Sequence, residues 1–128
     1  MDTCLSIYFQ NFHEKHNYAN NLSDLGHYYI EYTRLMDHWT KCLNINIYEV
    51  SYDEIVRNPE EEIRQLLEYM NLEWEENCLM FHQSDRYIAT ASHKQVREPI
   101  YTKSLERWKH YEDYMGPLIE ALKPLNTN

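Results

Sequence analysis

A single segment of strand-like sequence limits what this chain can fold into. Residues 45 to 50, INIYEV, are rich in β-branched and aromatic side chains and lie between two segments of helical pattern, which is typical of a short buried strand in an α/β layer. No second segment of the 128 residues has comparable strand character. Because a strand needs neighbours to pair its backbone, we expect partner strands from outside this sequence. The predicted fold is α/β and mostly helical, with one parallel-type strand.

Helical patterns occupy most of the remaining chain. We expect helices over residues 1–12, over 23–43 with Ser23 as the N-cap, and from Asn58-Pro59 to about residue 70. Apolar residues recur along the second helix at intervals of three and four, and we expect this stripe to be core: Leu25, Tyr28, Tyr32, Met36, Trp39 and Leu43. A chain of this length predicts one modest domain, residues 1–128.

Composition excludes several classes of protein. The formal net charge of −9 argues against a nucleic-acid partner, because binding a phosphate backbone needs many cations on one face. Three widely spaced cysteines, Cys4, Cys42 and Cys78, predict reduced thiols rather than a disulfide framework. Neither a signal peptide nor an 18-residue apolar run occurs, so we expect a soluble, cytoplasmic protein without a membrane span.

The histidines do not predict a metal site. His13 and His16 are three residues apart, which is compatible with one face of a helical turn, but they lie in a polar, asparagine-rich segment without a third ligand nearby. A solvated loop explains them better. The seven histidines of the chain form no ligand pattern, and the prediction is that no metal is bound.

Positive charge is concentrated near the C-terminal end. Between Ser84 and His110 there are six cations and three anions. The cations are Arg86, Lys94, Arg97, Lys103, Arg107 and Lys109, and the anions are Asp85, Glu98 and Glu106. Hydroxyls, guanidinium groups and a helix start make this segment a candidate anion-binding loop. The alternative is an ordinary solvated basic loop.

The order of residues in this loop resembles the cofactor loop of sulfotransferases. Ser92 is followed by Gln95-Val96, Pro99, Tyr101, and then a basic residue directly before Trp108. The likeness is greatest to bacterial sulfotransferase domains that are often fused to tetratricopeptide repeats, and more distant to tyrosylprotein sulfotransferases. CLSIYFQNF, residues 4–12, looks like the end of the family's 3′-phosphate motif. Residues 49–70 are similar to the family's strand, cofactor-contacting tyrosine and following helix.

The resemblance implies the C-terminal, mostly helical part of a P-loop-like sulfotransferase fold. It implies transfer of a sulfuryl group from 3′-phosphoadenosine-5′-phosphosulfate (PAPS) to an unknown acceptor hydroxyl, with Ser92 as the catalytic residue. The cofactor-binding residues that it implies are Ser6, Tyr52, Ser92, Gln95, Val96, Arg97, Pro99, Tyr101 and Arg107. From the residues alone, Ser6 could equally be an ordinary helix serine and Tyr52 a cap on the sheet edge.

Two parts of a complete family member have no counterpart in this sequence. These are the glycine-rich loop that holds the 5′-phosphosulfate and the general base for the acceptor. The two glycines, Gly26 and Gly116, are too far apart to form such a loop. We therefore expect a sulfotransferase fragment, inactive alone, whose partner is the missing N-terminal half or a second copy through self-association. The alternative function is a noncatalytic helical protein-interaction module.

Overall fold

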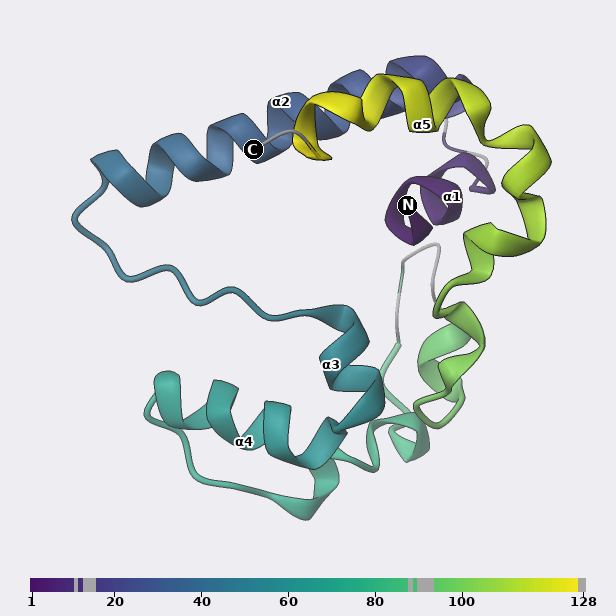
Figure 1. Ribbon diagram of the computed structural model, residues 1–128. Helices are drawn as coiled ribbons and strands as arrows, with labels where there is room; N and C mark the ends of the chain where they lie inside the picture. Colours follow the sequence, from purple (N-terminus) through teal and green to yellow (C-terminus); the bar gives the residue numbers. More distant parts are fainter. Residues whose placement is uncertain (11, 13–15, 88, 90–93, 127–128) are drawn as a thin grey trace. The chain divides into compact units, whose positions relative to one another are not determined.

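Helices form every regular element of the part of the chain that the computed structural model describes, which is residues 1–10, 12, 16–87, 89 and 94–126 (Figure 1). The α-helices are α1 (Asp2–Tyr8), α2 (Leu22–Cys42), α3 (Tyr52–Arg57), α4 (Pro59–Tyr69) and α5 (Gly116–Leu122). The 3-10 helices are η1 (Asn17–Asn20), η2 (Glu76–Cys78), η3 (Phe81–Gln83), η4 (Gln95–Arg97), η5 (Thr102–Ser104), η6 (Arg107–Tyr114) and η7 (Lys123–Asn126). The chain divides into two compact units. Unit 1 is Met1–Asn46 with Glu106–Asn128, and unit 2 is Ile47–Leu105.

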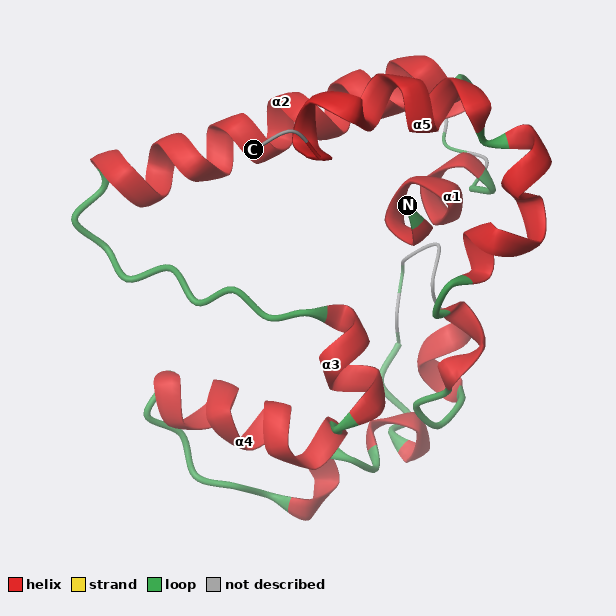
Figure 2. Ribbon diagram, viewed as in Figure 1, coloured by secondary structure: helices red, strands yellow, loops and turns green. Residues whose placement is uncertain are grey.

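The predicted α/β fold is wrong, because the described residues are all helix and loop, without a strand (Figure 2). Residues 45–50 form an irregular connection from α2 to α3, and Ile45 is 62% exposed. Strand preference reflects packing on a pleated, half-buried surface more than an intrinsic backbone preference. No other segment of strand-like sequence pairs with these residues, so their composition alone does not make a strand.

The core of unit 1 lies between α1, α2 and α5. Its buried residues are Cys4, Leu5, Leu25, Met115, Leu118 and Leu122. Figure 1 shows α5 lying along the first half of α2. The two helices approach closely at Gly26, where an added Cβ atom would be 2.6 Å from the Cβ atom of Ala121. Burial raises the pKa of the Cys4 thiol, which is one of three free cysteines.

The apolar stripe of α2 is mostly exposed, contrary to the prediction that it is core. Leu25 is 1% exposed and Met36 is half-buried. The other four members, Tyr28, Tyr32, Trp39 and Leu43, are between 42% and 53% exposed. Length explains the difference: α5 has 7 residues and α2 has 21, which correspond to about 10 Å and about 31 Å of helix. A helix as short as α5 can cover only one end of α2.

Helix ends also differ from the sequence-based expectations. The side chain of Asn21 caps α2 by accepting hydrogen bonds from the backbone N–H groups of Ser23 (2.9 Å) and Asp24 (3.1 Å), so Ser23 is not the N-cap. The first helix ends at Tyr8 rather than near residue 12. Near the C-terminal end of the basic segment, the chain forms the 3-10 helix η6, which begins at Arg107.

Unit 2 is built around the contact between α3 and α4. Val56 of α3 is buried, whereas α4 has no fully buried residue. The ring of Tyr48 packs against that of Tyr69 at the end of α4, with 4.9 Å between the centroids. Pro59 is the first residue of α4, and three glutamates follow it in the first turn, which suits the free N–H groups there. The predicted start of this helix is confirmed.

We expect Gly26→Ala to destabilise unit 1. A methyl group at this position requires α2 and α5 to shift, and overpacking of this kind costs about 1–3 kcal/mol. The gain in helix propensity from glycine to alanine is only about 1 kcal/mol, so the free energy of unfolding should fall by up to about 2 kcal/mol. Gly116→Ala is the matched control, since an added Cβ atom there meets nothing within 4 Å. Urea unfolding measures both variants, and equal stability of the two would contradict the close approach.

Candidate functional site

The cations of the basic segment differ from the other cations in their pairing. Among the described residues, Arg34, Lys41, Arg64 and Lys123 each form an ion pair with a carboxylate three or four residues earlier in the chain. Of the six cations between Ser84 and His110, only Lys109 forms an ion pair with a described carboxylate, that of Glu106 at 2.6 Å. The other five, Arg86, Lys94, Arg97, Lys103 and Arg107, form none in that part of the chain. The segment therefore keeps positive charge that its own acids do not neutralise.

Unit 1 brings two predicted site residues onto neighbouring elements, α1 and η6. Ser6 is the fifth of the seven residues of α1 and is exposed, so its hydroxyl does not lie at the N-terminal end of this helix. Arg107 is the first residue of η6 and is also exposed. Its guanidinium carbon lies 5.1 Å from the centroid of the Phe9 ring, directly after α1.

A second contact joins the same two elements. The carboxylate of Asp2 accepts a hydrogen bond of 2.8 Å from the backbone N–H of Trp108, and the site of this bond is partly buried. The side chain of Trp108 packs against the core of unit 1. The ring of Phe9 also meets the ring of Tyr111 edge to face at 5.1 Å. The start of η6 is thus tied to α1 by a charged hydrogen bond and by aromatic contacts.

Unit 2 contains the other described site residues. Tyr52 is the first residue of α3 and is 56% exposed. Its position follows the connection from α2, but no sheet edge is present in the described residues for it to cap. Its phenol is available to a ligand.

The segment that contains η4 carries the remaining predicted positions. Gln95 and Arg97 are exposed, as is Pro99, while Val96 and Tyr101 are half-buried. Arg97 does not extend freely, because its Nη2 atom donates a hydrogen bond of 2.5 Å to the carbonyl oxygen of Arg86. The amine of Lys103 lies 5.9 Å from the centroid of the Tyr101 ring.

The predicted catalytic residue, Ser92, lies outside the described residues. Its role and its distance from the other predicted positions therefore stay predictions. Ser6 and Arg107 belong to unit 1, and the described positions from Tyr52 to Tyr101 belong to unit 2. Each group is considered on its own.

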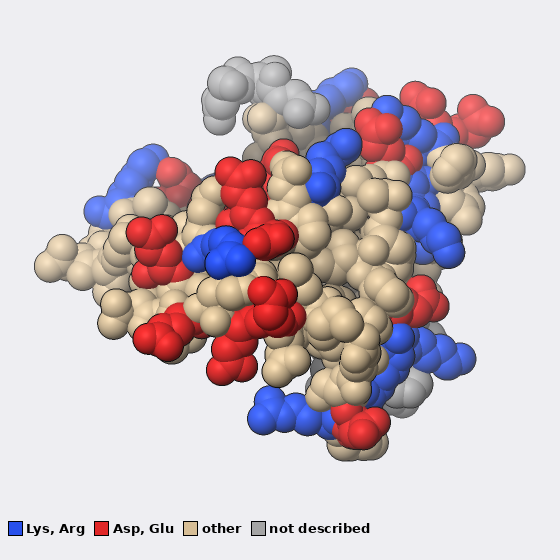
Figure 3. Space-filling model, turned by 90° about the horizontal axis from the view of Figure 1, so that it is seen from below, with Lys and Arg blue, Asp and Glu red and all other residues tan. Residues whose placement is uncertain are grey.

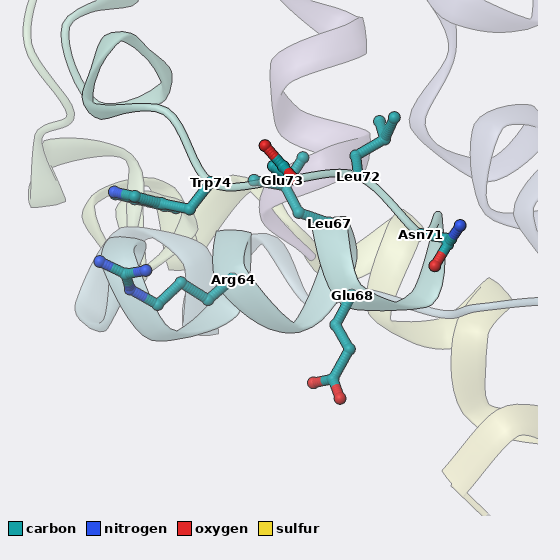
Figure 4. A pocket seen from close by; sticks show the side chains of 7 residues that line it. All are labelled: Arg64, Leu67, Glu68, Asn71, Leu72, Glu73 and Trp74. Carbon is teal, nitrogen blue, oxygen red and sulfur yellow. The ribbon is translucent and has the colours of Figure 1, made fainter.

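Unit 2 also has a groove of about 440 Å³ along the end of α4, which sequence analysis did not identify. Figure 4 shows the Trp74 ring lying against the Arg64 side chain, while Glu68 points away from both. The guanidinium carbon of Arg64 is 3.9 Å from the Trp74 ring centroid, and Arg64 also pairs with Glu60 at 2.8 Å. Because Arg64 already has a carboxylate partner, this groove is a weaker anion site than the start of η6.

The surface carries both signs of charge. Acidic and basic side chains both occur on the face drawn in Figure 3. Within residues 1–10, 12, 16–87, 89 and 94–126, no three His, Cys, Asp or Glu side chains group so that they could hold a metal ion. No helix in those same ranges has the length and apolar character needed to cross a bilayer.

Three residues of the site region were missed by sequence analysis: Asp2, Phe9 and Trp108. The pattern marks Asp2 only as an acid in the first helical turn and Phe9 only as an apolar helix residue. Asp2 and Trp108 are 106 positions apart in the sequence, so no local spacing of residues could have predicted the hydrogen bond between them. Trp108 itself was identifiable as a landmark of the basic segment, but not as a hydrogen-bond donor to α1.

Comparison with known proteins extends over nearly all of the chain. An uncharacterized protein from Aquifex aeolicus (strain VF5) is 41% identical over an alignment of 126 residues, and the match covers 96% of this chain and 17% of that protein. This chain therefore spans about a sixth of the length of the curated relative. No solved structure matches it.

A family model gives the class of protein. The model described as "Sulfotransferase family" matches residues 1–76, which include α1, Ser6 and Tyr52. The basic segment lies beyond this match but within the region shared with the Aquifex aeolicus protein, whose similarity covers 96% of the chain. The match exceeds half of the 128 residues, and the chain belongs to the sulfotransferase family.

Proposed function

We propose that this chain supplies the nucleotide side of a sulfotransferase domain that transfers a sulfuryl group from PAPS to an acceptor hydroxyl. The chain would bind the 3′-phosphate and the adenosine part of the donor. The 5′-phosphosulfate loop and the acceptor base would come from residues outside this sequence. Family membership supports the general chemistry, while the donor and the division of labour are part of the proposal.

The observation that carries this proposal is the unpaired positive charge of the basic segment. In a chain with a net charge of −9, acids are plentiful. Four of the five described cations outside the segment, all except Arg57, pair with one. Five cations between Ser84 and His110 have no such partner among the described residues. Guanidinium groups with unused N–H donors are suited to a phosphate, which they can bind through two parallel hydrogen bonds.

Arg107 is the best placed of these cations for the 3′-phosphate. Its guanidinium carbon lies over the Phe9 ring, 5.1 Å from the centroid, and an aromatic ring restrains a guanidinium group without neutralising the charge that attracts an anion. Ser6 on α1 would add a hydroxyl donor. Arg97 is less suitable in its present position, since one of its nitrogens donates to the Arg86 carbonyl.

The nucleotide-contacting roles of the unit 2 residues follow the family resemblance. Tyr52 would contact the adenine or ribose with its exposed ring. The backbone and side chains of Gln95, Val96, Pro99 and Tyr101 would line the nucleotide. Ser92 would donate to the bridging oxygen as the sulfuryl group leaves, a contact that matters most in the transition state.

A titration with adenosine 3′,5′-bisphosphate (PAP), followed by amide NMR signals of the isolated chain, tests this proposal. We expect weak binding, with changes at Ser6, Tyr52, Arg107 and residues 95–101. Adenosine 5′-monophosphate is the matched control ligand, because it lacks only the 3′-phosphate and should leave the signals of Ser6 and Arg107 unchanged. Changes confined to residues 12–20, or none at millimolar PAP, would contradict the proposed site.

One observation favours the second candidate, a noncatalytic helical interaction module. The exposed stripe of α2, which includes Tyr28, Tyr32, Trp39 and Leu43, is suited to an apolar partner such as a second copy of the chain. The charged residues beside it already pair internally, Arg34 with Glu31 and Lys41 with Asp37. A chain that associates through this stripe and ignores PAP would support the module instead of the transferase.

A further inference from the structure

The backbone directly before Arg107 adopts an unusual conformation. Glu106 has φ 56° and ψ 19°, which is the left-handed region that side chains other than glycine seldom adopt. Its carboxylate pairs with Lys109 at 2.6 Å, and its carbonyl oxygen accepts from the backbone N–H of Lys109 at 3.0 Å. This turn changes the direction of the chain at the position from which the Arg107 side chain departs.

Two contacts hold that turn against α1. Asp2 accepts the hydrogen bond from the N–H of Trp108 on one side of Arg107. The guanidinium carbon of Arg107 lies 5.1 Å from the centroid of the Phe9 ring, and the Phe9 ring is itself in edge-to-face contact with Tyr111. Asp2 and Phe9 stand at the two ends of the same helical segment, so they fix the backbone and the side-chain tip of Arg107 respectively.

The consequence is electrostatic as well as steric. Asp2 accepts from a backbone N–H, and none of the ion pairs among the described residues joins its carboxylate to Arg107. An aromatic ring restrains a guanidinium group without occupying its N–H donors or cancelling its charge. Among the described residues, Arg107 is therefore held in place without a carboxylate partner, so its N–H donors and its charge can serve an anion, and this reduces the entropy lost on binding.

We infer that Asp2 and Phe9 are positioning residues, which preorganise Arg107 for an anionic ligand of the phosphate class. This inference rests on the proposed function for the identity of the ligand, but not for the geometry. Replacement of a residue that positions Arg107 should change the surroundings of the guanidinium group before any nucleotide is added. It should also weaken nucleotide binding, because Arg107 would no longer be held in place.

The experiment uses the full 128-residue chain and follows the Nε–H signal of Arg107 by NMR. In the wild-type chain we expect the upfield shift of a proton above an aromatic ring. Asp2→Ala and Phe9→Leu should reduce that shift. Asp2→Asn should largely retain it, because the amide oxygen can still accept from the Trp108 N–H. Thr3→Ala, an exposed change in the same helical turn, is the control for general effects on α1, and Tyr8→Leu is the control for loss of a nearby ring.

Titration with PAP then measures the effect on binding. Asp2→Ala should weaken the apparent affinity on the order of fivefold, the size of one lost hydrogen bond, and Asp2→Asn should restore most of it. Thermal unfolding of the same variants shows whether a loss of stability accounts for the change. An Arg107 signal that is the same in Asp2→Ala, Phe9→Leu and wild type would overturn the inference. A wild-type chain with the shifted Arg107 signal but no response to PAP would instead overturn the proposed function alone.

Discussion

The isolated 128-residue chain is expected to show no sulfuryl transfer from PAPS above the level of a Ser92→Ala control. Transfer of this kind resembles phosphoryl transfer, in which a protein positions the reacting groups and stabilises charge on the departing oxygen. In the proposed division of roles, Arg107 and Ser6 hold the 3′-phosphate from one side. The sequence contains no glycine-rich loop for the 5′-phosphosulfate, because its two glycines are 90 positions apart, at Gly26 and Gly116.

The expected loss is large enough to measure clearly. Positioning and charge stabilisation each contribute several kcal/mol in enzymes, and a combined loss of about 8 kcal/mol corresponds to roughly a million-fold in rate. The assay follows labelled sulfate from PAPS to a panel of carbohydrate, peptide and lipid hydroxyls. A complete domain of the same family is the positive control. Turnover by this chain alone that Ser92→Ala abolishes would show that a complete active site is present.

The helices could be predicted from the sequence because their signals are local. Asn58-Pro59 followed by three glutamates specifies where α4 begins, whatever the rest of the chain does. The strand prediction failed for the opposite reason. Residues 45–50 have the composition of a strand, but a strand exists only when a neighbour pairs its backbone and covers its face. The prediction that the apolar stripe of α2 is core failed for the same reason. Burial of Trp39 requires another element to cover it, and α5 is too short to do so.

The candidate site was predicted in part, through chemistry rather than contacts. An excess of cations between Ser84 and His110 is visible in the sequence, and the resemblance selects two of them, Arg97 and Arg107, as cofactor-binding residues. The sequence could not predict which of these cations form ion pairs, because pairing depends on which residues share a helix face and on the turn at Glu106. The hydrogen bond from Trp108 to Asp2 depends on how the two ends of the chain meet in unit 1. Such a contact is a product of the fold and has no signature in residue spacing.

Replacement of Arg107 by alanine should weaken PAP binding by about 1.5–3 kcal/mol, the range for a hydrogen bond to a charged group. This is roughly 10-fold to 150-fold in the dissociation constant. The loss should be large because Arg107 has no carboxylate partner among the described residues, so its removal takes away a donor committed to the ligand. Binding can be measured by calorimetry in a longer protein, made by placing this chain in the matching segment of the Aquifex aeolicus relative, of which it spans 17%.

Lys109→Ala is the matched control for Arg107→Ala, since it removes the same charge two residues away on the same 3-10 helix. Lys109 already pairs with Glu106 on the protein surface and has no proposed contact with the ligand, so its loss acts only through the solvent-screened field and should cost less than about 0.5 kcal/mol. Salt separates the two effects further. At 0.1 M ionic strength the screening length is about 10 Å, which suppresses the remote contribution of Lys109 but leaves a direct contact between Arg107 and phosphate largely intact. If the two variants weaken PAP binding equally, and if both losses disappear at high salt, then Arg107 contributes only to the general field and does not touch the 3′-phosphate.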